Sequence, residues 1–346
     1  MTAPTPKRGS LMAAEVAEQP AVLGRLLTEG AADIAAVRGQ IGRRAPRFVL
    51  IAARGTSDHA GLYGKYLAEI RMGLPAGLAS PSTMTVYGSR PDLSDVLFLA
   101  ISQSGGSPDL VDSVAAARSC GALTVAVTNN VDSPLATAAE LEIDVRAGHE
   151  RAVAATKSYT AELLALYLLL AGGDPGGQGA AESAAALPDA AAATLAGSAA
   201  ITAAARYRFV DHLVTTARGY SYPTAREAAL KLMETSYLGA QAFSGADLLH
   251  GPMAMIGPDV PVLAVTSAGR GGAAMAPVLD RLQQIGADVL QIGPPSGLPL
   301  VTEGVPEELL PVLEILPLQQ LAWRLALDRG GDPDAPRGLS KVTETW

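Results

Sequence analysis

The chain has 346 residues, of which 49% are hydrophobic and 17% are charged, and its formal net charge at pH 7 is −8. This composition excludes intrinsic disorder as the main state. The acidic balance, without a block of Lys or Arg, argues against binding to nucleic acid or to an anionic membrane. A single cysteine, Cys120, cannot form an intrachain disulfide, and no signal peptide is evident. The longest apolar stretch, 163–172, is too short to span a membrane, so we expect a soluble cytoplasmic protein.

The first half of the chain shows apolar runs separated by helical stretches. Residues 11–38 carry apolar side chains at helical spacing and predict one or two leading helices, within a leader that we place at residues 1–45. Runs rich in apolar residues then occur at 48–52, 96–101, 123–127 and 141–145. Such runs between helices are typical of strands buried on both faces of a parallel sheet. We therefore expect a doubly wound α/β domain over residues 46–172.

The segment 173–204 is rich in glycine and then in alanine. A connecting helix fits its Ala-rich part, and a disordered linker is the alternative. Beyond it the alternation resumes, with apolar runs at 213–216, 262–265 and 289–292 and helical stretches at 223–237 and 275–284. These elements predict a second α/β domain over residues 205–330, followed by a C-terminal tail at 331–346.

An internal repeat links the two domains. Residues 53–57 read Ala-Arg-Gly-Thr-Ser and residues 217–221 read Ala-Arg-Gly-Tyr-Ser, an offset of 217 − 53 = 164. At the same offset Gly105 has a glycine as its counterpart and Ser102 has a threonine. Agreement of an arginine, glycines and hydroxyl positions in one register predicts two copies of one α/β unit.

The most distinctive motif lies between the run at 96–101 and the helical stretch after it. Residues 102–107 read Ser-Gln-Ser-Gly-Gly-Ser, followed by Pro108 and Asp109. Free amides at a helix N-terminus, together with hydroxyl donors and two glycines, fit a phosphate monoester. The spacing matches neither a P-loop nor a dinucleotide fingerprint. An ordinary capped turn between a strand and a helix is the alternative that the spacing leaves open.

A second turn is expected beside this motif. If the strands at 48–52 and 96–101 flank the switch point of a doubly wound sheet, residues 54–57 (Arg-Gly-Thr-Ser) lie next to residues 102–107. Their hydroxyls would then complete a phosphate shell. The repeated copy of the motif, at 266–271, keeps glycines but loses most hydroxyls, which suits one phosphate site per chain.

The helical stretch 223–237 carries three ionisable side chains on one face. Glu227, Lys231 and Glu234 stand at i, i+4 and i+7. A solvated salt-bridge ladder is one interpretation, but the apolar neighbours indicate that much of the helix is buried, where charged groups usually have a function. His250 precedes Gly-Pro in a loop, and a packed loop histidine is the alternative to one that titrates.

The remaining candidates are weaker on spacing alone. Lys341 would ordinarily be a solvated lysine in the tail. The other histidines, His59, His149 and His212, are scattered through the chain, and their spacing does not indicate a metal site. We therefore expect neither a metal ion nor a cofactor.

With these motifs assembled, the chain resembles the double-SIS (sugar isomerase) family, and in particular the isomerase half of glutamine–fructose-6-phosphate aminotransferases, over nearly its full length. The matching stretches are 55–57, 102–105, 154–157, 227–232, 234, 250–252 and 341. The resemblance implies two tandem flavodoxin-like SIS domains with doubly wound parallel sheets. It also implies a homodimer in which His250 completes the site of the neighbouring subunit.

The resemblance implies roles for individual residues. Binding of the phosphate and sugar of a hexose 6-phosphate is implied for Gly55, Thr56, Ser57, Ser102, Gln103, Ser104, Ser107 and the backbone at Val153. Glu234 would move the proton between C1 and C2, and His250 would assist ring opening. Lys231 and Lys341 would complete the catalytic set, with Glu227 in support.

Departures from the synthases point to a different reaction. No glutaminase segment precedes residue 46, so glutamine-derived ammonia is not expected, and Arg54 and Gly106 make the motifs look more like those of SIS-type glucosamine-6-phosphate deaminases. We expect a glutamine-independent deaminase/isomerase that converts glucosamine 6-phosphate to fructose 6-phosphate and ammonia. Three alternatives remain: a lyase or dehydratase acting on N-acetylglucosamine 6-phosphate, a deglycase of sugar–amine phosphates, and a non-enzymatic phosphosugar sensor.

Overall fold

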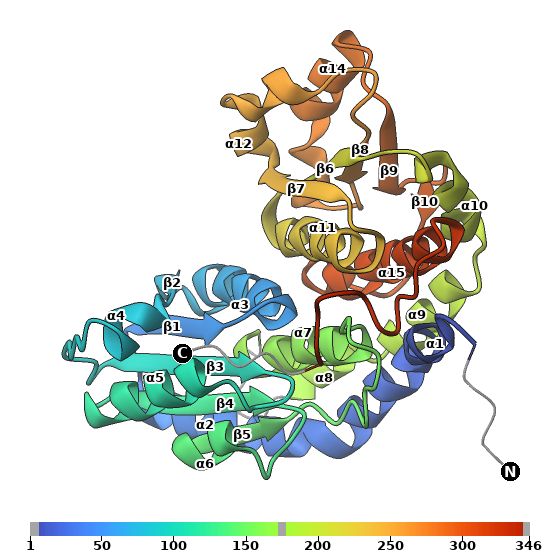
Figure 1. The fold of residues 1–346 in the computed structure, drawn as a ribbon. Helices are drawn as coiled ribbons and strands as arrows, with labels where there is room; N and C mark the ends of the chain where they lie inside the picture. The colour runs from blue at the N-terminus through green and yellow to red at the C-terminus, as the bar shows by residue number, and fades with distance from the viewer. Residues whose placement is uncertain (1–6, 172–177, 342–346) are drawn as a thin grey trace, which may run out of the picture. The chain divides into compact units, whose positions relative to one another are not determined.

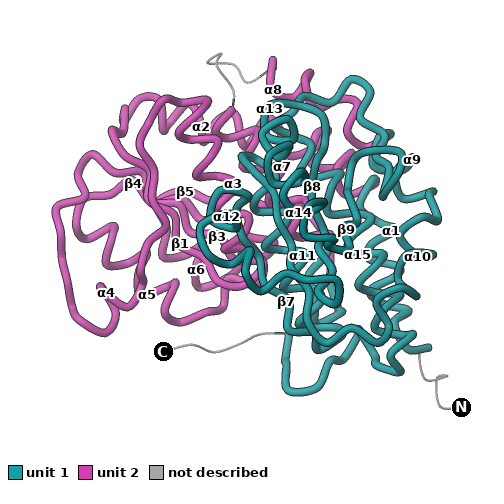
Figure 2. The backbone as a smooth tube through the Cα atoms, turned by 90° about the horizontal axis from the view of Figure 1, so that it is seen from above, with its two compact units in different colours: residues 1–20, 150–156, 189–341 teal, residues 21–149, 157–188, 342–346 magenta. Residues whose placement is uncertain are grey.

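The computed structural model describes residues 7–171 and 178–341. They form two compact units, which are coloured separately in Figure 2. Among the described residues, unit 1 holds 7–20, 150–156 and 189–341, and unit 2 holds 21–149, 157–171 and 178–188. Unit 2 therefore carries the first copy of the predicted repeat, and unit 1 carries the second.

Unit 2 is built on a five-stranded sheet in which every strand pair is parallel. Its strands are β1 (Phe48–Ala53), β2 (Ala76–Leu78), β3 (Val96–Ser102), β4 (Leu123–Thr128) and β5 (Leu141–Asp144). The spatial order is β2-β1-β3-β4-β5, so the chain reverses direction across the sheet between β1 and β3 (Figure 1). This order is that of flavodoxin-like folds, which place ligands at such a reversal.

Helices cover both faces of this sheet. The helices of this part of the chain are α1 (Ser10–Arg25), α2 (Ala31–Arg44), α3 (Thr56–Leu67), α4 (Pro81–Thr85), α5 (Pro108–Ser119), α6 (Pro134–Ala138), α7 (Lys157–Leu170) and α8 (Gln178–Ser183). Turns of π-helix at Leu26–Gly30 and Ala68–Met72 extend the first and third of them. The leading helices that the sequence predicts are present as α1 and α2, and α3 follows β1.

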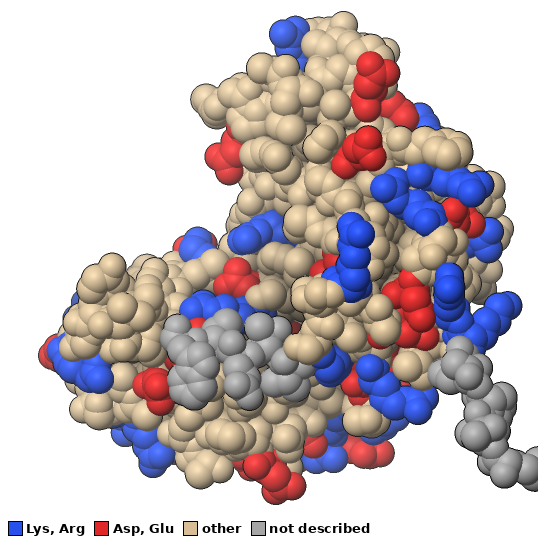
Figure 3. Space-filling view, viewed as in Figure 1, with Lys and Arg blue, Asp and Glu red and all other residues tan. Residues whose placement is uncertain are grey.

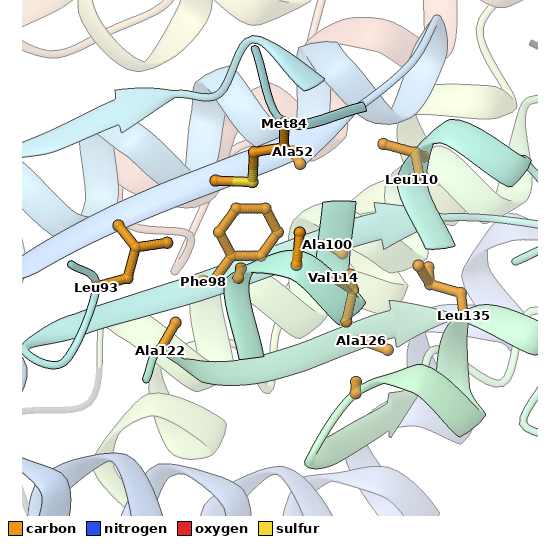
Figure 4. Packing of buried hydrophobic residues seen from close by; sticks show 13 residues of the cluster. Ala52, Met84, Leu93, Phe98, Ala100, Leu110, Val114, Ala122, Ala126 and Leu135 are labelled. Atoms are coloured by element: carbon orange, nitrogen blue, oxygen red, sulfur yellow. The ribbon is translucent and has the colours of Figure 1, made fainter. Parts of the chain in front are cut away.

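Phe98 shows how the core of unit 2 is packed. Its ring lies next to Met84 of α4 in Figure 4, in one cluster with Val114 of α5 and Leu135 of α6, and it is fully buried. Successive residues of a strand point to opposite faces. Leu97 and Leu99, also fully buried, therefore line the other face of β3. Burial on both faces explains why the strand reads as an unbroken apolar run.

Unit 1 repeats the same topology. Its strands are β6 (His212–Ala217), β7 (Gly239–Ser244), β8 (Val262–Val265), β9 (Val289–Gly293) and β10 (Leu298–Pro299), all paired in parallel. The order β7-β6-β8-β9-β10 is that of the first sheet, counted within each unit. Both ends of β6 lie 164 residues after the ends of β1 (212 − 48 and 217 − 53). The predicted repeat and the doubly wound α/β fold are confirmed.

The helices of unit 1 follow the prediction less closely. They are α9 (Leu187–Leu195), α10 (Ala199–Ala204), α11 (Tyr222–Ser236), α12 (Gly245–Leu249), α13 (Arg270–Ala273), α14 (Ala276–Gln284) and α15 (Leu310–Asp328). The Ala-rich connection is helical but divided among α8, α9 and α10, and residues 173–177 of the predicted segment 173–204 lie outside the described residues. Gly197 and Ser198, which separate α9 from α10, are poor helix formers.

The short outer strands are absent from the sequence prediction. β2 and β10 have three and two residues, and β7 alternates between exposed and less exposed positions instead of forming an apolar run. In the described part of the chain, no single helix has the length and apolar composition of a membrane span. One pair, Gly179–Leu195 and Ala199–Tyr207, has both only when taken together, and it is bent by 49°. Acidic and basic side chains are interspersed on the face drawn in Figure 3.

Candidate active site

The predicted phosphate loop joins β3 to α5. The hydroxyl oxygen of Ser102 accepts a hydrogen bond from the amide of Gly105 at 3.1 Å, and that of Ser104 accepts one from the amide of Gly106 at 3.3 Å. Because both oxygens act as acceptors here, their hydroxyl protons are kept for another acceptor. Gly105 has φ +63°, and a Cβ at this position would collide with Ser133. The tight loop therefore requires glycine.

The start of α5 is arranged as the sequence predicts. Ser107 is the N-cap residue and Pro108 opens the helix, although the Ser107 side chain makes no capping hydrogen bond. Asp109, 4% exposed, lies in the first turn and pairs with Arg54, whose guanidinium approaches its carboxylate to 2.6 Å. This ion pair joins the turn after β1 to the helix that follows β3.

The two turns lie side by side, as expected. β1 and β3 are paired in register to their ends, with Ala53 opposite Ile101. Gly55, with φ +55°, makes the turn, and Thr56 begins α3. The buried Ser57 donates its hydroxyl proton to Oε1 of Glu162 on α7 at 2.9 Å. That proton is therefore engaged in this structure, and the phosphate role of Ser57 stays a prediction.

The two corresponding turns of the second repeat form hydrogen bonds with carboxylates of the same unit. Ser221, the counterpart of Ser57, donates its hydroxyl proton to the buried Glu314 of α15 at 2.7 Å, and Thr224 donates to the same carboxylate at 3.0 Å. In the counterpart of the phosphate loop, the amide of Gly271 donates to Oε1 of Glu307 at 2.8 Å. In the second repeat a carboxylate of the chain itself thus contacts the loop whose counterpart in the first repeat is the predicted phosphate loop.

Three ionisable side chains meet on α11, as their spacing predicts. The ammonium of Lys231 lies 3.3 Å from Oε1 of Glu227 and 2.6 Å from Oε2 of Glu234. The side chains of Lys231 and Glu227 are fully buried, whereas that of Glu234 is 22% exposed. The interpretation as a solvated ladder is therefore wrong, because the apolar flanks of the helix pack into unit 1.

The charge of Lys231 is determined by its neighbours. Burial alone would lower the pKa of this ammonium, but the carboxylates of Glu227 and Glu234 outweigh burial and raise the pKa above its ordinary value. Lys231 therefore remains a cation at physiological pH. It can stabilise negative charge and orient Glu234, but it cannot act as a neutral amine nucleophile.

His250 lies where α12 ends. Its backbone amide donates to the carbonyl of Asp247 at 3.0 Å, and Gly251, which follows, has φ +123°. The imidazole belongs to an exposed residue, and Leu249 and Met255 nearby are 43% and 41% exposed. The interpretation as a packed loop histidine is therefore wrong for the isolated chain.

The tail brings Lys341 to the loop of residues 150–156. The Lys341 ammonium donates to the carbonyl of Ala152 at 2.7 Å and lies 3.2 Å from Oε2 of Glu150. Val153, the next residue of the loop, donates its amide to the carbonyl of Asp334 in the tail at 3.3 Å. Lys341 is 25% exposed, so it is not a freely solvated tail lysine.

The predicted site residues fall into two groups. Unit 2 holds Gly55, Thr56, Ser57, Ser102, Gln103, Ser104 and Ser107, and unit 1 holds Glu227, Lys231, Glu234, His250, Val153 and Lys341. Sequence analysis missed the buried glutamates Glu150 and Glu162. Among the described residues, no cluster of His, Cys, Asp or Glu has the arrangement of a metal site.

Comparison with known proteins identifies the family. A family model for the SIS domain matches residues 44–172 and 208–293, one stretch in each repeat. The chain is 36% identical over 367 aligned positions to the isomerizing glutamine–fructose-6-phosphate aminotransferase of Symbiobacterium thermophilum. That alignment covers 95% of this chain and 58% of the relative. The chain belongs to the SIS domain family, and it spans somewhat more than half of the length of this relative.

Solved structures agree with this relationship. A candidate phosphosugar isomerase from Silicibacter pomeroyi is 36% identical, with a TM-score of 0.84 over 95% of this chain and 100% of that chain. The C-terminal domain of glucosamine-fructose-6-phosphate aminotransferase from Francisella tularensis is 25% identical, with a TM-score of 0.81 over 94% and 98%. This chain is thus a double-SIS protein related to the isomerase part of those aminotransferases.

Proposed function

We propose that this chain is an isomerising deaminase that converts glucosamine 6-phosphate and water to fructose 6-phosphate and ammonia without glutamine. The observation that carries the proposal is the arrangement on α11. A fully buried lysine holds one oxygen of Glu234, and Glu234 is itself 22% exposed. A carboxylate that is held by a buried cation and is still partly exposed to solvent is suited to proton transfer to and from a bound substrate.

The phosphate is assigned to the loop of residues 102–107 in unit 2. Ser102 and Ser104 keep hydroxyl protons for an anion, and the N-terminus of the twelve-residue helix α5 adds partial positive charge. In the second repeat, the Glu307 carboxylate already accepts a loop amide. This contrast supports one phosphate site per chain.

The proposed chemistry starts from the open-chain amino sugar, with His250 assisting ring opening. Glu234 removes the proton from C2, and the electron pair moves toward the C1 carbonyl to give an enolamine. Lys231 and Lys341 stabilise the negative charge that develops on oxygen. Return of the proton to C1 leaves an imine at C2, and water replaces the nitrogen to release ammonia and fructose 6-phosphate.

Deamination is favoured over synthesis by the form of the motifs. Arg54 and Gly106 resemble the pattern of SIS-type deaminases, and Arg54 contacts Asp109 at the start of the phosphate-loop helix.

A product assay without glutamine tests whether the chain catalyses deamination. Ammonia and fructose 6-phosphate from glucosamine 6-phosphate are expected. An unsaturated product from N-acetylglucosamine 6-phosphate, a free amine from a sugar–amine phosphate, or binding without turnover would contradict it.

Glu234→Gln is the decisive variant. Removing the carboxylate base is expected to lower kcat by about 10²–10⁴-fold while the substrate still binds, because the phosphate contacts are untouched. The matched control is Glu303→Gln, an exposed glutamate of the same unit, which should turn over like the wild type. Wild-type turnover by Glu234→Gln would remove Glu234 from the mechanism.

A further inference from the structure

The C-terminal tail of unit 1 (residues 331–341) is attached at several separate points. The carboxylate of Asp334 accepts hydrogen bonds from the amides of Leu11 and Met12 at 3.0 and 2.8 Å, at the beginning of α1. Farther along, the amide of Arg337 donates to the hydroxyl of Tyr237 at 2.9 Å, and its guanidinium lies 4.2 Å from the centre of that ring. These contacts define the path of the tail before it reaches Lys341.

Tyr237 connects this path to the helix that carries Glu234. It is the residue directly after α11, and its φ of 56° places it in the left-handed region, which a tyrosine seldom adopts. The tail therefore crosses the end of α11 three residues beyond Glu234. A fixed tail presents its lysine at a defined place relative to that helix.

The last attachment is the pair formed by Glu150 and Lys341. Glu150 has a fully buried side chain, and its Oε1 accepts the amide of Thr156 at 2.8 Å. Its other oxygen, Oε2, lies 3.2 Å from the Lys341 ammonium, which also donates to the carbonyl of Ala152 at 2.7 Å. One oxygen of the carboxylate is thus held by the loop of residues 150–156, and the other contacts the tail.

Burial separates this pair from an ordinary surface ion pair. Exposed pairs contribute little because both side chains are mobile and solvated. Here the carboxylate is desolvated, so removing its cationic partner would be costly, and the lysine contacts two acceptors at once. These two contacts restrict the orientation of Lys341.

We propose that Glu150 is the positioning residue of Lys341. Glu150 aims the ammonium and keeps it in place, and it does so without contacting the substrate itself. This inference rests on the proposed function for its effect on catalysis, since it assumes that Lys341 stabilises developing charge. Its structural part, that Glu150 holds Lys341, can be measured without any substrate.

The substrate-free test is amine labelling. Wild type and Glu150→Gln are treated briefly with acetic anhydride, and acetylation of Lys341 is followed by mass spectrometry relative to Lys65 in unit 2. Loss of the carboxylate should speed acetylation of Lys341 by about threefold to tenfold, because an ammonium held by a carboxylate must first leave it and lose a proton before the neutral amine can attack the anhydride. Equal labelling in both proteins would overturn the proposal.

Glu15→Gln is the matched control. Glu15 is also a buried carboxylate, and it accepts the amide of Ala152 at 3.2 Å, so it supports the same loop without contacting Lys341. Labelling of Lys341 should be unchanged in this variant. If both variants accelerate labelling equally, general loosening of the loop explains the effect and the proposal fails. Melting curves of both variants identify any loss of folding.

Kinetics then test the catalytic consequence. Glu150→Gln should lower kcat with little change in KM, and it should cause no further loss in the Lys341→Gln background, because both substitutions remove the same effect. Full additivity would contradict positioning. Absence of deamination in the wild type would refute the proposed function and leave the labelling result standing.

Discussion

At the scale of the residue, the buried charged side chains of the candidate site have partners of opposite charge in the part of the chain that the structure describes. Lys231 and Glu227 are both fully buried, and each would be expensive alone. Because the carboxylates of Glu227 and Glu234 raise the pKa of Lys231, the side chain stays cationic, and the catalytic contribution that we propose for it is electrostatic. The same ammonium contacts Glu227 and Glu234, so it also holds one oxygen of Glu234.

Glu314 gives a prediction about pH. Burial raises the pKa of this carboxyl above its ordinary value of 4.5, and the hydrogen bonds from Ser221 and Thr224 only partly oppose burial. The folded state then binds its proton more tightly than the unfolded state does. The Glu314 contribution to stability is therefore present below pH 4.5 and is lost as the pH rises through the raised folded-state value.

Glu314→Gln should remove this dependence. The free energy of unfolding of the wild type should fall relative to that of the variant as the pH is raised from 5 to 8. The limit for one group is about 1.4 kcal/mol per pH unit. Urea denaturation at a series of pH values measures the difference. Parallel stability curves for the two proteins would show that Glu314 does not bind the proton more tightly after folding.

At the scale of the element, the proposed phosphate site lies on two turns, each of which joins a strand to a helix. The loop after β3 and the turn after β1 lie together because β1 and β3 are neighbours at the reversal of strand order. Ser102→Ala is expected to raise KM for phosphorylated substrates by about tenfold or more, because a hydrogen bond to a charged group is lost. Steady-state kinetics provide the measurement, with kcat expected to change less than KM.

The repeat supplies the control for Ser102→Ala. Thr266 is the counterpart of Ser102, and its hydroxyl donates to the side chain of Gln291 at 3.0 Å. Thr266→Ala removes an equivalent hydroxyl from the other repeat and should leave KM unchanged. An unchanged KM in Ser102→Ala, or an equal rise in both variants, would remove the loop after β3 from the proposed phosphate site.

The strands and helices differ in how well the amino-acid sequence predicts them. Strands buried on both faces, such as β3 and β4, are continuous apolar runs and were located to within one residue. β7 was missed because it has no such run. On α11 the three ionisable residues share one helix face, so their meeting follows from spacing alone.

Contacts between residues far apart in the sequence could not be predicted from these patterns. Ser57 and Glu162 are 105 residues apart, and Lys341 and Glu150 are 191 apart. Helical and strand periodicities extend over one element only, so they carry no information about which loop the tail reaches. The internal repeat does not predict this contact either. Glu162 accepts from Ser57, and Glu314 accepts from Ser221, which is the counterpart of Ser57. The two glutamates are 314 − 162 = 152 residues apart instead of 164, so they do not align in the repeat.

At the scale of the whole molecule, the two copies of one unit differ at the same loop. The loop of the first copy carries serine hydroxyls, whereas an amide of the corresponding loop in the second copy donates to Glu307. In the proposed function the first copy therefore binds the phosphate, and the second contributes Glu234 and His250. His250 is exposed on its own chain, among exposed apolar side chains such as Leu249. We expect a second copy of the chain to cover this surface and to receive His250 in its site.

Mixing two inactive variants tests this arrangement. Each of His250→Ala and Glu234→Gln should be inactive alone. After subunit exchange at equal amounts, about half of the dimers are mixed, and each mixed dimer has one site with both residues intact if His250 crosses the interface. Recovered deamination should therefore approach about a quarter of the wild-type rate. If His250 serves its own chain, every site still lacks one residue and the mixture stays inactive, as do the unmixed variants carried through the same exchange.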